Sequence, residues 1–70
     1  MYVHQLDVKL PDVGKHYVQK GTNRIVKVVD MFLEGTIYGI VEYYDVATYF
    51  TYYSSAIQFV DQYQPVTGMW

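Results

Sequence analysis

Hydrophobic and polar residues alternate along much of this chain with the period of two that is typical of β-strands. The alternation is clearest over residues 2–10, where apolar side chains occupy most of the even positions. Apolar and β-branched runs follow at residues 17–20, 24–33, 37–45 and 48–53. We therefore predict five strands with these bounds.

Short links rich in turn-forming residues separate the predicted strands. Pro and Gly in residues 11–14 favour a turn, and residues 21–23, 34–36 and 45–47 provide the other links. Both alternating rows of residues 24–33 are largely apolar, which predicts a central strand covered on both sides. Gly39 within the fourth run indicates a bulge or a close backbone approach.

A helix is expected only near the end of the chain. Ser55 followed by Gln58 matches the capping-box pattern, and Pro65 blocks continuation, so we predict a short helix over residues 55–63. Val66 would then add a final short strand. A helical stripe with spacings of three and four also runs through residues 46–63, which leaves one long helix as the competing interpretation.

Five short strands, tight links and a late helical turn are typical of a small bent barrel. Over residues 14–66 the chain resembles small bacterial and phage SH3-like domains of unknown function. The segments that carry the resemblance are residues 16–21, 24–29, 40–44 and 56–60. The expected fold is thus mainly β: a small SH3-like barrel of about five strands with one short helix or 3-10 turn near the C-terminus, forming a single domain over residues 1–70. The resemblance implies no catalytic residues.

Composition narrows the function classes. The 70 residues are 51% hydrophobic and contain no cysteine, which excludes disulfides and thiolate metal sites. No apolar run approaches the roughly 20 residues needed to span a bilayer. The first residues lack the basic and apolar regions of a signal peptide. We therefore expect a cytoplasmic protein without a membrane partner.

Charge and tyrosine divide unevenly along the chain. All five Lys and Arg residues lie within residues 1–27, whereas five of the seven acidic residues and no basic residue follow Lys27. Seven of the nine tyrosines also follow Lys27. An acidic, tyrosine-rich half favours contact with a protein partner that has a basic surface.

Two pairs of adjacent tyrosines indicate where that contact lies. Neighbours on a strand face opposite sides, so one member each of Tyr43/Tyr44 and Tyr52/Tyr53 should point outward, in a patch beside Glu42 or Asp45. Aromatic patches of this kind are enriched at protein interfaces. The predicted partner-binding residues are Glu42, Tyr43, Tyr44, Asp45, Tyr49, Tyr52 and Tyr53.

No residue set in the sequence indicates an enzyme, a metal site or a cofactor. The only histidines, His4 and His16, lie on different predicted strands and are expected at the surface. Ser54 and Ser55 are explained by helix capping, and no glycine pattern matches a phosphate-binding loop. Glu42 and Asp45 fall on opposite strand faces, which predicts solvated carboxylates near a hairpin rather than a shared acid–base site.

The preferred hypothesis is a non-enzymatic protein-interaction module. One concrete version is a phage-encoded inhibitor or accessory protein in the host cytoplasm that covers a basic surface of a host protein. The first alternative is a nucleic-acid-binding barrel that uses the basic half of the chain: Lys15, Tyr17, Lys20, Arg24 and Lys27. The net charge of −2 makes nucleic-acid binding the weaker hypothesis. The second alternative is a self-assembling subunit, with strand edges paired between copies in a homo-oligomer.

Overall fold

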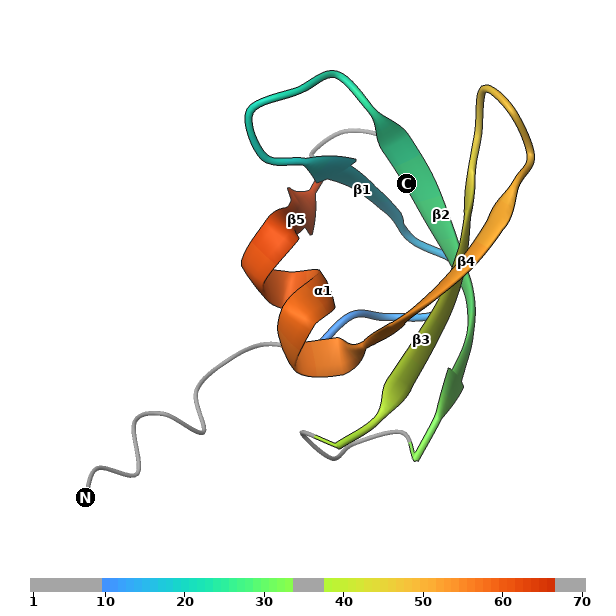
Figure 1. The fold of residues 1–70 in the computed structure, drawn as a ribbon, viewed down its shortest axis with the longest axis vertical. Helices are drawn as coiled ribbons and strands as arrows, with labels where there is room; N and C mark the ends of the chain where they lie inside the picture. Colours follow the sequence, from blue (N-terminus) through green and yellow to red (C-terminus); the bar gives the residue numbers. More distant parts are fainter. Residues whose placement is uncertain (1–9, 34–37, 67–70) are drawn as a thin grey trace.

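A computed structural model describes residues 10–33 and 38–66 of the chain, and these form a curved antiparallel sheet with one short helix (Figure 1). The elements are β1 (His16–Gln19), β2 (Ile25–Phe32), β3 (Ile40–Asp45), β4 (Thr51–Ser55), α1 (Ala56–Gln62) and β5 (Tyr63–Pro65). The sheet order is β4-β3-β2-β1-β5. The prediction of a mainly β protein with one short helix is confirmed, and the five described strands form a single open sheet.

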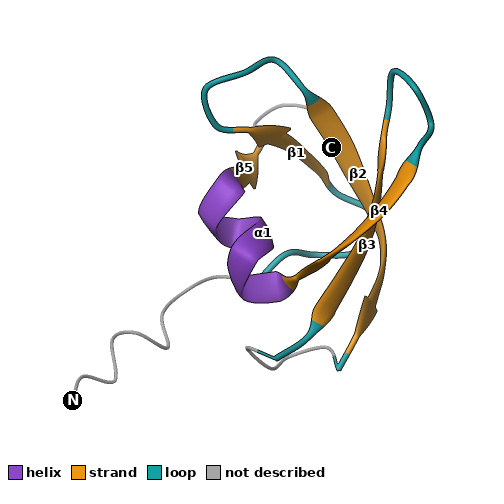
Figure 2. Cartoon of the chain, viewed as in Figure 1, coloured by secondary structure: helices purple, strands orange, loops and turns teal. Residues whose placement is uncertain are grey.

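Several strand bounds differ from the sequence prediction, because some residues that were predicted in strands lie in loops (Figure 2). The predicted strand over residues 2–10 lies outside the described residues except for Leu10, which is not in a strand. The predicted strand over residues 48–53 begins instead at Thr51, because Asp45 Oδ1 accepts hydrogen bonds from the backbone N–H groups of Ala47 and Thr48 and holds a wider hairpin loop. Gly39 precedes β3, which begins at Ile40, and the bulge that the structure has lies in β2, between Val28 and Asp30.

The helix is short, which excludes the competing long helix over residues 46–63. Ser55 is its N-cap, and its hydroxyl oxygen accepts a hydrogen bond from the Gln58 N–H at 3.1 Å, as the capping-box pattern predicted. The helix ends when Tyr63 adopts an extended backbone (φ −125°), and the last strand is Tyr63–Pro65 rather than a strand around Val66.

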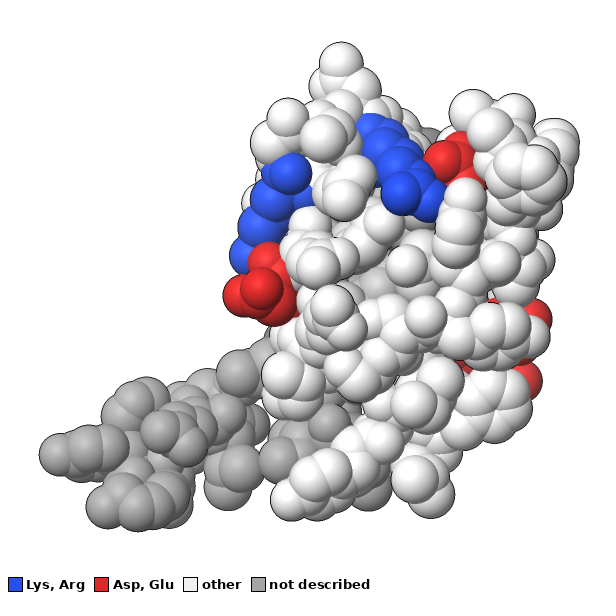
Figure 3. All heavy atoms as spheres, viewed as in Figure 1, with Lys and Arg blue, Asp and Glu red and all other residues white. Residues whose placement is uncertain are grey.

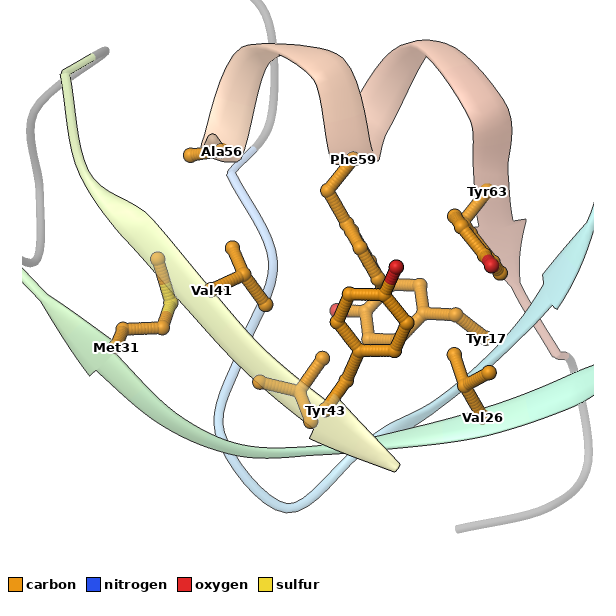
Figure 4. Packing of buried hydrophobic residues seen from close by; sticks show 9 residues of the cluster. Tyr17, Val26, Met31, Val41, Tyr43, Ala56, Phe59 and Tyr63 are labelled. Atoms are coloured by element: carbon orange, nitrogen blue, oxygen red, sulfur yellow. The ribbon is translucent and has the colours of Figure 1, made fainter. Parts of the chain in front are cut away.

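The hydrophobic core lies between α1 and the inner face of the sheet, and Figure 4 shows its side chains meeting in this space. Phe59 is fully buried and contacts three tyrosine rings. The buried members of the core are Tyr17, Val26, Val28, Met31, Val41, Tyr43, Ala56, Phe59 and Tyr63. Burial of so many large rings gives a small chain a well-packed interior.

Only one face of the sheet is covered by described residues. We call the side turned away from α1 the outer face. On β2 the outward residues Val29, Asp30 and Phe32 are exposed, so the prediction of a strand buried on both sides is wrong there. Figure 1 shows α1 on the concave side of the sheet, and no described helix or strand covers the convex side.

Candidate functional site

The strand register determines which predicted site residues share the outer face. Glu42 lies directly between Asp30 of β2 and Tyr53 of β4 in the cross-strand pairing. The neighbouring row contains Tyr44, with Lys27 on one side and Thr51 on the other. Cross-strand partners project from the same face, so the two rows form one continuous surface.

Two of the three tyrosine side chains on this surface are open to solvent. Tyr53 is 62% exposed and Tyr49, in the hairpin loop between β3 and β4, is 75% exposed. The Tyr49 ring lies 5.9 Å from the ring of half-buried Tyr44. We call the set Asp30, Glu42, Tyr44, Tyr49 and Tyr53 the outer patch; it joins three tyrosine rings to two carboxylates.

Tyr49 occupies this position through an unusual backbone. Its φ of 65° lies in the left-handed region, which bulky residues seldom adopt. The Tyr49 N–H donates to the Asp45 carbonyl at 2.7 Å, and the Asp45 N–H donates to the Phe50 carbonyl at 3.0 Å. These bonds close the loop and direct an aromatic ring toward Tyr44, where glycine would fit the backbone with less strain.

Three of the predicted partner-binding residues lie on the opposite side of the sheet. Tyr43 is part of the core, and Tyr52 is half-buried and stacks on Tyr43 with ring centroids 5.7 Å apart. The expectation of a solvated Asp45 is wrong, since this residue is 9% exposed. Inward-facing Asp45 requires a partner, and Arg24 Nε provides one at 2.9 Å from Asp45 Oδ2.

Hydrogen bonds to its carboxylate explain the lowered pKa of Asp45. The Ala47 N–H bond, with smaller help from Arg24 and Thr48, outweighs burial and lowers the pKa of Asp45. The Arg24 guanidinium also lies over the Tyr52 ring, 4.8 Å from its centroid. Arg24 and Asp45 therefore pair with each other and stabilise the end of β3.

The residues of the nucleic-acid alternative do not converge. Lys27 lies on the outer face, Arg24 is paired with Asp45, and Tyr17 is buried with its hydroxyl accepting a hydrogen bond from the Asp12 N–H. Lys15 and Lys20 line a groove on the other side of the molecule. Figure 3 shows the basic side chains of one side in two separate areas, each adjoining acidic atoms.

That groove, of about 770 Å³, lies between α1, β5 and the segment that precedes β1. Its apolar lining includes Ile57, Val60 and Pro65. Two lysines, Lys15 and Lys20, and two aspartates, Asp12 and Asp61, also line it, so the groove does not favour a ligand of either charge. Among residues 10–33 and 38–66, no group of three His, Cys, Asp or Glu side chains is placed to hold a metal ion.

No family model, curated protein or solved structure matches the chain. Within the part of the chain that the structure describes, no helix has the length and apolar character to cross a membrane. The function must therefore be inferred from the outer patch itself.

Proposed function

We propose that this protein is a non-enzymatic interaction module that binds a basic protein surface through the outer patch. The observation that carries the proposal is the row in which Glu42 lies between Asp30 and exposed Tyr53. Tyrosine contributes a large contact area at interfaces, and carboxylates beside it favour an Arg- or Lys-rich partner.

The apolar surroundings of the outer patch support the same function. Phe32 and Ile40 are cross-strand partners in the next row, and both are partly exposed. Val29, at the bulge of β2 between Val28 and Asp30, is exposed on the other side of the Asp30–Glu42 row. An extended area with aromatic and aliphatic residues next to a charged row is typical of a binding surface.

The resemblance to small SH3-like domains stays part of this proposal. Antiparallel pairing of β1 with both β2 and β5, and a short helix between β4 and β5, support it. The barrel itself, the cytoplasmic location and the more specific role as a phage-encoded inhibitor of a host protein stay predictions.

Affinity capture with charge-reversed variants tests the proposal. Glu42→Lys should lose protein partners that the unmodified protein retains from a lysate of its source organism, because it places a positive charge at the centre of the outer patch. Asp61→Lys is the matched control, since it changes the net charge equally but replaces an exposed residue of α1, away from the outer patch. Captured proteins identified by mass spectrometry can then be titrated by calorimetry, in which Tyr53→Ala should weaken binding by about 2 kcal/mol.

Equal loss of partners in Glu42→Lys and Asp61→Lys would contradict the proposal, because it would show a dependence on net charge alone. Undiminished binding by Glu42→Lys would contradict it as well. Circular dichroism of each variant checks that the fold is retained.

A further inference from the structure

We propose that the basic partner adds an extended strand to the edge of β4 that no described strand covers and places an Arg or Lys opposite Tyr53. This inference rests on the proposed function and specifies how the partner binds. Strand addition is a common mode of peptide recognition, in which backbone hydrogen bonds give affinity and alternate side chains give specificity.

Within the described residues, β4 pairs with β3 alone and is an edge of the sheet. The bonds from the Asp45 N–H to the Phe50 carbonyl and from the Ala56 N–H to the Gly39 carbonyl continue the β3–β4 ladder at its two ends. Alternation along an antiparallel ladder then turns the backbone groups of Tyr52 and Ser54 toward β3. The N–H and C=O groups of Thr51 and Tyr53 are directed to the free edge.

The sequence of β4 leaves this edge unprotected. Proteins usually guard an exposed edge with a charge, a proline or a bulge, and Thr-Tyr-Tyr-Ser-Ser contains no charged residue and no proline. Its pairing with β3 is regular, without a register shift. The opposite edge differs, since β5 has only three residues and one of them is Pro65.

The acidic residues next to the edge of β4 favour a basic segment as the added strand. A residue opposite Tyr53 on an added strand would extend the row of Asp30, Glu42 and Tyr53. It would lie two strand spacings, about 10 Å, from Glu42, a separation that an arginine and a glutamate side chain can span together. Its cation would pass over the Tyr53 ring, a favourable contact. A second copy of this chain would instead bring another acidic row to the edge, so we choose a basic partner segment.

Hydrogen exchange with a model peptide provides the test. The probe is a seven-residue peptide of alternating Thr and Arg, added to ¹⁵N-labelled protein. Binding should slow amide exchange at Thr51 and Tyr53 at least tenfold and leave the exposed amides of the β1–β2 loop unchanged. The control peptide has the same sequence with the backbone nitrogens on one edge methylated. It keeps every charge but cannot pair, so its affinity should fall about tenfold or more.

The outcomes separate this inference from the proposed function. Equal affinity of the two peptides, with both weakened by Glu42→Lys and not by Asp61→Lys, would overturn strand addition while the proposed function survives. No binding of the unmethylated peptide would overturn strand addition, and affinity capture would still decide the proposed function. Sedimentation of the protein alone that shows a dimer, lost in Thr51→Pro and kept in Thr51→Ala, would make a second copy the occupant and overturn the inference.

Discussion

Tyr43 is the member of the Tyr43/Tyr44 pair whose side chain packs in the core. Its ring contacts Phe59 at 5.0 Å and Tyr63 at 5.5 Å between centroids. Burial, together with a hydrogen bond to the Tyr63 hydroxyl, raises the pKa of Tyr43 to about 12. The adjacent Tyr44 faces outward, so two identical neighbours have different roles.

The raised pKa of Tyr43 predicts alkaline sensitivity. The unfolded chain releases this proton near pH 10, before the folded protein does. The contribution to stability is therefore fully present below pH 10 and is lost as the pH rises through about 12. Urea unfolding should show a smaller loss of stability between these pH values for Tyr43→Phe than for the unmodified protein.

The control for this experiment is Tyr53→Phe, which removes a hydroxyl from an exposed tyrosine. Its pH dependence should match that of the unmodified protein. An unchanged alkaline profile in Tyr43→Phe would contradict the assignment of the raised pKa to this residue. Burial also raises the pKa of Tyr17, so part of the alkaline loss should remain in both variants.

Among the elements, α1 depends most clearly on a single cap. The helix has seven residues, too few to be stable alone, and it begins directly after β4 without a linker. Ser55→Ala removes the acceptor for the Gln58 N–H and should lower the free energy of unfolding by about 1 kcal/mol. For a domain of this size the melting temperature should fall by roughly 4–8 °C.

Ser55→Asp tests the cap directly, because its carboxylate can accept the same hydrogen bond. Its melting temperature should lie close to that of the unmodified protein in thermal denaturation followed by circular dichroism. If the alanine and aspartate variants melt together, the cap does not stabilise α1 as described.

The strand β2 shows where sequence reasoning succeeds and where it stops. The run of apolar and β-branched residues predicted the strand, and in the structure Val26 and Val28 are both buried on its inner face. Strict alternation would also turn Asp30 inward and Met31 outward. The bulge reverses this order, buries Met31 and places Asp30 beside Glu42. No residue of β2 is typical of a bulge, so the position of Asp30 beside Glu42 could not be predicted from the sequence.

In the hairpin of β3 and β4, the sequence likewise predicted the candidate site only in part. Adjacent tyrosines indicated that one of each pair faces outward, but sequence alone did not show which one. Asp45 is tolerated on the inner face because it pairs with Arg24, a residue 21 positions away that no local pattern connects to it. Long-range register, rather than residue type, decides which predicted residues form the outer patch.

At the scale of the whole molecule, the distribution of charge predicts weak nucleic-acid binding. The net charge is −2, and the described basic residues are divided between the outer face, the pair with Asp45 and the groove. Fluorescence anisotropy with single- and double-stranded oligonucleotides near physiological salt should show no tight binding. Tight binding that weakens steeply with added salt would show that several cations contact phosphates together, and it would favour the nucleic-acid alternative.

The pairing of β1 with β5 also determines how quickly the chain can fold. Tyr17 lies opposite Pro65, although almost the whole described chain separates them in sequence. The hairpins β2–β3 and β3–β4 close short loops and can form early, whereas β5 has only three residues to offset the entropy of a long closure. We expect folding in milliseconds to seconds, with docking of β5 as a late step. The end of the molecule that carries the groove would thus form after the outer patch.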